Sequence, residues 1–240
     1  MGKTLIQQAR GKGGPTYRAP SFKYKGCAKH KRFSSSAEQI SGKVLDIISC
    51  RGHSAPLAVV EYHDNEICLL IAPEGIKVGD NVISNSNKNQ EAGYTTQLKF
   101  LPDGTMVYNI ESSPGDGGKF CRASGTYAKI INKLEGKVSV MLPSKKRREF
   151  QPTCRANIGI VAGGGRTEKP FLKAGKKLYS MKARNKLYPI VSGSAMNAVD
   201  HPFGNKRTSR KSKAKPAPKN APPGRKVGMI RPRRTGRRKK

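Results

Sequence analysis

The 240-residue sequence contains no tryptophan, and only 6% of its residues are aromatic. Acidic residues are also scarce: 15 Asp and Glu stand against 48 Lys and Arg, for a formal net charge of +33 at pH 7. Repulsion at that charge opposes a compact, isolated monomer. The sequence therefore predicts a polyanionic partner.

Long hydrophobic runs are missing as well. No stretch approaches the roughly 20 apolar residues of a membrane span, and no apolar signal-peptide core follows Met1. Myristoylation at Gly2 requires Ser or Thr at position six, but this chain has Ile6 there. Neither end has the apolar helical face of an interfacial anchor. We expect no membrane attachment.

The five cysteines are odd in number and scattered, which is typical of reduced cytosolic thiols rather than of a disulfide framework. Cys27 with His30 and Cys50 with His53 have the spacing of zinc ligands. However, His30 lies among cations, and Cys50 ends a strand-like run. We therefore expect no metal site. We interpret four of the five cysteines as small buried thiols: Cys50, Cys68, Cys121 and Cys154.

The positive charge is concentrated at the two ends. Residues 1–35 hold nine Lys and Arg, residues 201–240 hold sixteen, and neither segment has an acidic residue. Both are rich in Gly and Pro, so we expect them to fold only on a partner. Aromatic residues between the N-terminal cations can stack on unpaired bases, namely Tyr17, Phe22, Tyr24 and Phe33.

Between these ends, short β-branched runs alternate with Gly, Asp and Pro turns. Residues 57–62 and 66–72 predict a hairpin, and residues 126–151 predict strands broken at 135–136 and at 143–144. Two such sets predict two small antiparallel barrels, divided near residue 112. Helical spacing follows at Phe171, Ala174, Leu178 and Met181.

Two motifs invite a catalytic or nucleotide-binding interpretation, and neither satisfies it. The loop PGDGGKF has Phe120 after Lys119, where a P-loop needs Ser or Thr, although its amides suit a nucleic-acid phosphate. Asp200 and His201 are adjacent, so in an extended chain their side chains point to opposite sides. We interpret this pair as an exit bend pressed against the partner.

A nucleic acid is the partner that these features favour, since arginine-rich segments bind phosphates in bidentate fashion. RNA is favoured over DNA because neither a groove-reading helix nor a dimerising core is visible. A chromatin-like DNA-compacting protein and an acid–base enzyme using His201 remain the alternatives.

Several motifs occur together along the whole chain: PGDGGK, RASGTYA, CRANIGIVAG, VAGGGRTEKP, AMNAVDHPFG and NAPPGRKVGMI with RRTGRR. With IAPEG, they make the sequence resemble the universal large-subunit ribosomal protein L-two family, in its archaeal and eukaryotic branch.

The resemblance implies a mainly β fold with an OB-like barrel at residues 37–111. An SH3-like barrel follows at 112–192, with a helical segment near 171–186, and basic extensions span 1–36 and 193–240. It implies a non-enzymatic, structural role on large-subunit rRNA in the cytoplasm, in organising the peptidyl-transferase region, placing tRNA and joining the small subunit. Neighbouring ribosomal proteins would be partners. No cofactor is expected, and structural Mg²⁺ at an RNA interface is compatible with the sequence.

The expected rRNA-binding residues are all cationic: Arg10, Lys12, Arg18, Arg122, Arg155, Arg166, Lys206, Arg207, Arg225, Lys226, Arg233 and Arg234. Asp200 and His201 would form the loop near the peptidyl-transferase centre. The family's loop reads His-Pro-His-Gly-Gly, whereas this chain has Phe203 and Asn205 at the third and fifth positions. Asn205 must then adopt the backbone shape that the second glycine served.

Overall fold

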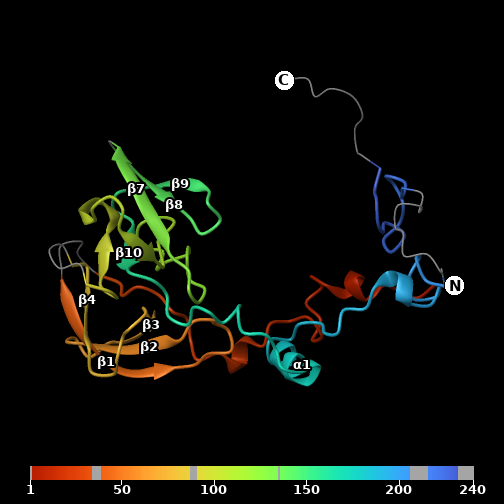
Figure 1. The fold of residues 1–240 in the computed structure, drawn as a ribbon, viewed down its shortest axis with the longest axis horizontal. Helices are drawn as coiled ribbons and strands as arrows, with labels where there is room; N and C mark the ends of the chain where they lie inside the picture. Colours follow the sequence, from red (N-terminus) through yellow and green to blue (C-terminus); the bar gives the residue numbers. More distant parts are fainter. Residues whose placement is uncertain (1, 34–38, 87–90, 135, 206–215, 232–240) are drawn as a thin grey trace. The chain divides into compact units, whose positions relative to one another are not determined.

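The computed structural model describes residues 2–33, 39–86, 91–134, 136–205 and 216–231. The chain divides into two compact units (Figure 1). The sheet unit comprises residues 21–171, and the terminal unit comprises residues 1–20 together with 172–240.

The described residues of the sheet unit form one ten-stranded sheet in the order β3-β2-β1-β4-β5-β10-β6-β7-β8-β9. Every pairing is antiparallel except the single contact of β4 with β5. The mainly β prediction is therefore confirmed. The strands are β1 Ile40–Ile48, β2 Leu57–Tyr62, β3 Ile67–Ile71, β4 Asn81–Ser84, β5 Thr95–Gln97, β6 Met106–Tyr108, β7 Ala128–Leu134, β8 Lys137–Met141, β9 Arg147–Phe150 and β10 Arg155–Ile158.

The predicted hairpin and the predicted strand breaks both occur in the sheet. β2 and β3 pair from Leu57 with Ile71 to Glu61 with Ile67, and Asn65 closes the turn with φ of 60°. Asparagine tolerates that left-handed conformation better than most residues. β7 ends and β8 begins on either side of the predicted break at 135–136, and the break at 143–144 separates β8 from β9. The division into barrels at 37–111 and 112–192 stays a prediction.

One hydrophobic core joins strands from both ends of the sheet. Val60 on β2, Ile130 on β7 and Val140 on β8 are fully buried in the same cluster. Burying one such side chain contributes about 1.5–3 kcal/mol. This shared core holds the strands of the unit together.

β10 lies at the centre of the sheet, between β5 and β6. Arg155 pairs with Gln97 of β5, and Ile158 pairs with Val107 of β6. The Asn157 amide also donates hydrogen bonds of 2.9 Å to the Gly93 carbonyl and the Thr95 hydroxyl. A short strand from late in the chain thus completes the pairing of two earlier ones.

Among its described residues, the terminal unit contains the helix α1, Ala174–Ala183, and two 3₁₀ turns, Ile6–Ala9 and Gly193–Ala195. The helical spacing of Ala174, Leu178 and Met181 is confirmed, whereas Phe171 precedes the helix. Asn185, just beyond it, donates from its amide to the Pro15 carbonyl at 2.6 Å and the Arg18 carbonyl at 2.8 Å. These bonds join segments from the two ends of the chain. Within the described ranges, no helix is long and apolar enough to cross a membrane.

Candidate nucleic-acid interface

The terminal unit carries most of the surplus charge. Asp200 is its single acidic residue, against 26 Lys and Arg. The predicted binding residues of this unit that the structure describes are all exposed: Arg10, Lys12, Arg18, Arg225 and Lys226. Four others fall outside the described residues: Lys206, Arg207, Arg233 and Arg234.

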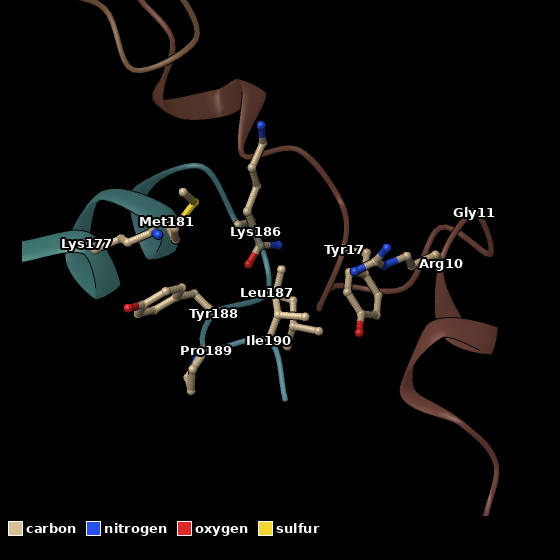
Figure 2. A pocket seen from close by; sticks show the side chains of 11 residues that line it. Arg10, Gly11, Tyr17, Lys177, Met181, Lys186, Leu187, Tyr188, Pro189 and Ile190 are labelled. Atoms are coloured by element: carbon tan, nitrogen blue, oxygen red, sulfur yellow. The ribbon is translucent and has the colours of Figure 1, made fainter. Parts of the chain in front are cut away.

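A pocket of about 870 Å³ lies in the terminal unit (Figure 2). One wall comes from α1 and the segment that follows it, with Lys177, Tyr188 and Ile190, and the other from Arg10 and Tyr17. Figure 2 shows Leu187 and Ile190 between the two tyrosines. The Lys177 ammonium is 5.3 Å from the centre of the Tyr188 ring, and the Arg10 guanidinium is 5.6 Å from that of Tyr17. Among the described residues that line it, none is acidic.

Asp200 and His201 engage different partners. The Asp200 carboxylate is 3.8 Å from the Lys3 ammonium, and the Phe203 N–H donates to Nδ1 of His201 at 3.0 Å. Gly193 lies so close to the imidazole that a Cβ there would be 2.3 Å from Cε1 of His201. The histidine is therefore held by backbone and packing rather than by its acidic neighbour.

The backbone after His201 has the conformation expected where Asn205 replaces the second glycine of the family's loop. Asn205 has φ of 55°, the left-handed conformation for which the second glycine would serve. Its N–H donates to the Met196 carbonyl at 3.1 Å, and the Gly204 N–H donates to the His201 carbonyl at 2.9 Å. These bonds make the segment a folded bend, as predicted. Whether a partner presses against it stays a prediction.

Arg155 is bonded inside the sheet unit. Its side chain is 10% exposed and donates to Glu111 Oε1 from Nε at 3.2 Å and from a terminal nitrogen at 2.8 Å. The other terminal nitrogen donates to the Lys31 carbonyl at 2.6 Å, and its own N–H donates to Glu111 Oε2. The side chain thus holds the N-terminal segment onto β10, and its predicted rRNA contact stays a prediction.

Arg122 has a similar role at lower burial. Its guanidinium donates to the Ala28 carbonyl at 2.6 Å and to the Gly118 carbonyl at 3.2 Å. Burial lowers the pKa of this side chain. Arg122 is half-buried as a residue, and its Nε is a buried nitrogen with no hydrogen-bond partner among the described residues. Arg122 and Arg155 therefore both fasten the segment around Ala28.

Residues 28–31 correct the expectation that the whole N-terminal segment needs a partner to bury itself. Ala28, His30 and Lys31 are almost fully buried in the sheet unit. The Lys31 ammonium forms ion pairs with Asp64 and Glu66 and lies 4.9 Å from the centre of the Tyr62 ring. This lysine neutralises the chain's own carboxylates, so not every N-terminal cation is available to a polyanion.

His30 is a structural histidine in this arrangement. Its Nε2 donates to the Asn109 carbonyl at 2.7 Å, and its Nδ1 has no partner in the described part of the chain. Burial lowers the pKa of His30 to about 4, so the ring is neutral at physiological pH. The proximity of Glu111 opposes that shift without cancelling it.

The thiols do not assemble a metal centre among the described residues. Cys50 and Cys154 are buried as predicted, whereas Cys68 and Cys121 are only half-buried and Cys27 is exposed. Burial raises the pKa of Cys68, Cys121 and Cys154 to about 11. These three thiols are therefore protonated at neutral pH.

The loop PGDGGK uses two of its amides internally. The Gly117 N–H donates to Glu111 Oε1 at 3.3 Å, and the Gly118 N–H donates to Asp116 Oδ1 at 3.1 Å. The expectation that this loop offers exposed amides to a phosphate is wrong for these two groups, because nearby carboxylates already accept from them.

Arg166 lies on an exposed loop of the sheet unit. Its Nε donates to the Ser124 hydroxyl at 2.8 Å. The backbones of Gly125 and Gly164 approach closely beside it, since a Cβ on Gly125 would be 2.7 Å from Cα of Gly164. Arg166 itself is exposed.

Sequence reasoning missed the pocket itself. Tyr17 was recognised as a stacking residue, but Lys177 and Tyr188 were not singled out. The signal that the sequence offered was a tyrosine close to a lysine in a basic segment. The pocket is formed by segments from the two ends of the chain, and neither segment alone shows that they come together.

Comparison with known proteins gives two family matches. Residues 2–84 match the model described as Ribosomal Proteins L2, RNA binding N-terminal domain, and residues 91–221 match Ribosomal Proteins L2, C-terminal domain. Among similar curated proteins is the large ribosomal subunit protein uL2 of Archaeoglobus fulgidus, 51% identical over 236 residues, 98% of this chain and 99% of that protein. The large ribosomal subunit protein uL2 of Methanococcoides burtonii is 48% identical, over 99% of this chain and 100% of that protein. The uL2 protein of Halorubrum lacusprofundi is 47% identical, over 99% of this chain and 98% of that protein.

Proposed function

The chain belongs to the ribosomal protein L2 family, and from that premise we propose that it is a structural constituent of the large ribosomal subunit that binds large-subunit rRNA. The charge distribution of the terminal unit carries the proposal. With one carboxylate among 26 cations, this unit has almost no internal counter-charge, so rRNA phosphates are its natural neutralising partner.

The bend of Asp200 and His201 serves as a local scaffold for RNA of the peptidyl-transferase region, and the protein supports subunit assembly, tRNA placement and subunit association. The role is structural, within cytoplasmic ribosomes and beside other ribosomal proteins. The bonding of His201 to Phe203, rather than to Asp200, supports a scaffold rather than a catalytic dyad.

The predicted rRNA-binding cations then divide into two groups. Exposed residues such as Arg10, Arg166 and Arg225 contact phosphates directly. Arg155 supports binding from inside, because its hydrogen bonds to Glu111 and to the Lys31 carbonyl fix the surface that the RNA meets. Arg122 combines both roles.

Truncation after Gly204 tests the proposal. The shortened chain should keep the circular dichroism of the folded sheet unit, because no residue of that unit is removed. It should fail to enter large subunits in a reconstitution followed by sedimentation, whereas the full chain enters. Normal sedimentation of the truncated chain with active subunits would contradict the proposed role of the C-terminal extension.

Binding measurements separate RNA from DNA. The affinity of the full chain for rRNA should fall steeply as salt rises, since each neutralised phosphate releases counterions. Duplex DNA of equal length, at matched salt, should bind more weakly. Equal affinity for both, with protection of DNA at regular lengths, would favour the DNA-compacting alternative.

A further inference from the structure

We propose that the pocket of the terminal unit binds a single unstacked nucleobase of the rRNA, with its phosphate held by the cations at the rim. This inference rests on the proposed function, because it names the RNA feature that one part of the same surface takes.

The pocket is large enough to admit a nucleotide, and its lining suits a base. A volume of about 870 Å³ lies within the range of small-ligand pockets. Its lining combines the rings of Tyr17 and Tyr188 with the apolar side chains of Leu187 and Ile190, as Figure 2 shows. A base offers a flat π-face to such a surface, whereas a free phosphate would leave these groups without a complement.

The charge of the pocket selects an anion. Lys177, Lys186 and Arg10 line it, and none of the described lining residues is acidic. Cations beside aromatic rings and an apolar wall require a ligand that is both negatively charged and flat. A nucleotide in a single-stranded or bulged region meets both requirements, while a base-paired duplex keeps its faces stacked and out of reach.

Hydrogen bonds hold the two walls of the pocket together. The two hydrogen bonds from Asn185 tie residues 15–18 to the segment after α1, and the Tyr17 hydroxyl donates to the Ile6 carbonyl at 3.2 Å. Tyr17 and Tyr188 are both half-buried. Little freedom of the rings is therefore lost on binding. By contrast, Ile190 is 73% exposed, which leaves an apolar surface uncovered in a highly charged unit.

A direct test uses the full chain and two probes of equal backbone charge: a fluorescent ten-residue oligouridylate and a ten-residue abasic strand. Tyr188→Leu should bind the oligouridylate at least fivefold more weakly, the loss expected for one base–aromatic stack. Its affinity for the abasic strand should not change, since the cations remain.

Two further variants make the result specific. Tyr188→Phe, which keeps the ring, should bind the oligouridylate more tightly than Tyr188→Leu. Tyr179→Leu is the matched control, because Tyr179 lies on α1, is 72% exposed and does not line the pocket. The proposal is overturned if Tyr188→Leu weakens both probes equally or neither, or if Tyr179→Leu has the same effect.

Reconstituted large subunits distinguish failure of this inference from failure of the proposed function. A chain that never enters subunits refutes the proposed function. If Tyr188→Leu enters but no unpaired rRNA nucleotide becomes more reactive to 2′-hydroxyl acylation, only the pocket inference fails. Ultraviolet crosslinking of wild-type subunits should attach a nucleotide to the peptide containing Tyr188. A crosslink to another protein instead would assign the pocket to a protein partner.

Discussion

The buried pair of Glu111 and Arg155 gives the sharpest test of how the sheet unit is held together. Glu111 is completely buried, and its carboxylate accepts hydrogen bonds from the Arg155 guanidinium, the Arg155 N–H and the Gly117 N–H. Glu111→Ala would leave a guanidinium that is only 10% exposed without its counter-charge. Breaking a buried pair from one side costs about 3–5 kcal/mol.

That cost is large beside the roughly 5–15 kcal/mol that stabilises a typical domain. For a unit of this size, each kcal/mol lowers the melting temperature by about 2–4 °C, so we expect a drop of roughly 6–20 °C. Thermal unfolding of the full chain, followed by circular dichroism, measures it. The exposed pair of Lys137 and Glu149 provides the control, because Glu149→Ala should change the melting temperature little.

A double variant separates two effects on the free energy of unfolding: the contribution of the ion pair itself, and the cost of burying the Arg155 guanidinium without a counter-charge. Glu111→Leu with Arg155→Met replaces both charges by apolar groups, and such replacements are often close to neutral. The double variant should therefore melt well above Glu111→Ala. If Glu111→Ala melts within 2 °C of the wild type, the reasoning about this pair is wrong.

The same pair predicts a pH dependence at the acid end. Burial alone would raise the pKa of Glu111, but the hydrogen bonds and charge of Arg155 outweigh it and hold the pKa below its usual value. A carboxylate with a lowered pKa contributes stability that is present above its ordinary pKa of about 4.3 and is lost as pH falls further. Glu111→Gln should therefore flatten the stability profile in that acid range.

Three further outcomes are expected. Burial lowers the pKa of His30 to about 4, so the unfolded state takes up a proton at higher pH than the folded state does. The free energy of unfolding, measured with urea, should therefore fall between pH 6.5 and pH 4. His30→Gln should reduce that fall. Gly125→Ala should lower the melting temperature of the sheet unit, because its Cβ would meet the Gly164 backbone at 2.7 Å with φ of 70°. Gly193→Ala should displace the His201 ring, detected as a shift of its imidazole NMR signals, while the sheet unit's melting temperature stays unchanged.

Local signals made much of the fold predictable. The turn at Asn65 and the breaks between β7, β8 and β9 are marked by residues adjacent to the strands they end. The helix follows from the spacing of Ala174, Leu178 and Met181. Alternation and turn chemistry act over a few residues, so one stretch of sequence is enough to read them.

The candidate site was less predictable, because charge counting treats every cation alike. Lys31 and Arg155 lie inside the sheet unit, since Asp64, Glu66 and Glu111 stand opposite them in the fold. Their partners lie 33 to 44 positions away in the sequence, and no periodicity connects them. The pocket between Tyr17 and Tyr188 depends on a still longer separation.

The central place of β10 also sets an order of events during synthesis. β5 cannot gain its main neighbour until residue 158 has been translated, some 60 residues after β5 itself. At a translation rate of roughly 5–20 residues per second, β5 and β6 each keep an unpaired edge for several seconds. An unpaired edge invites pairing with other chains. We therefore expect the nascent chain to be most prone to aggregation in this interval, and slowing translation between β6 and β10 should lower the yield of soluble protein.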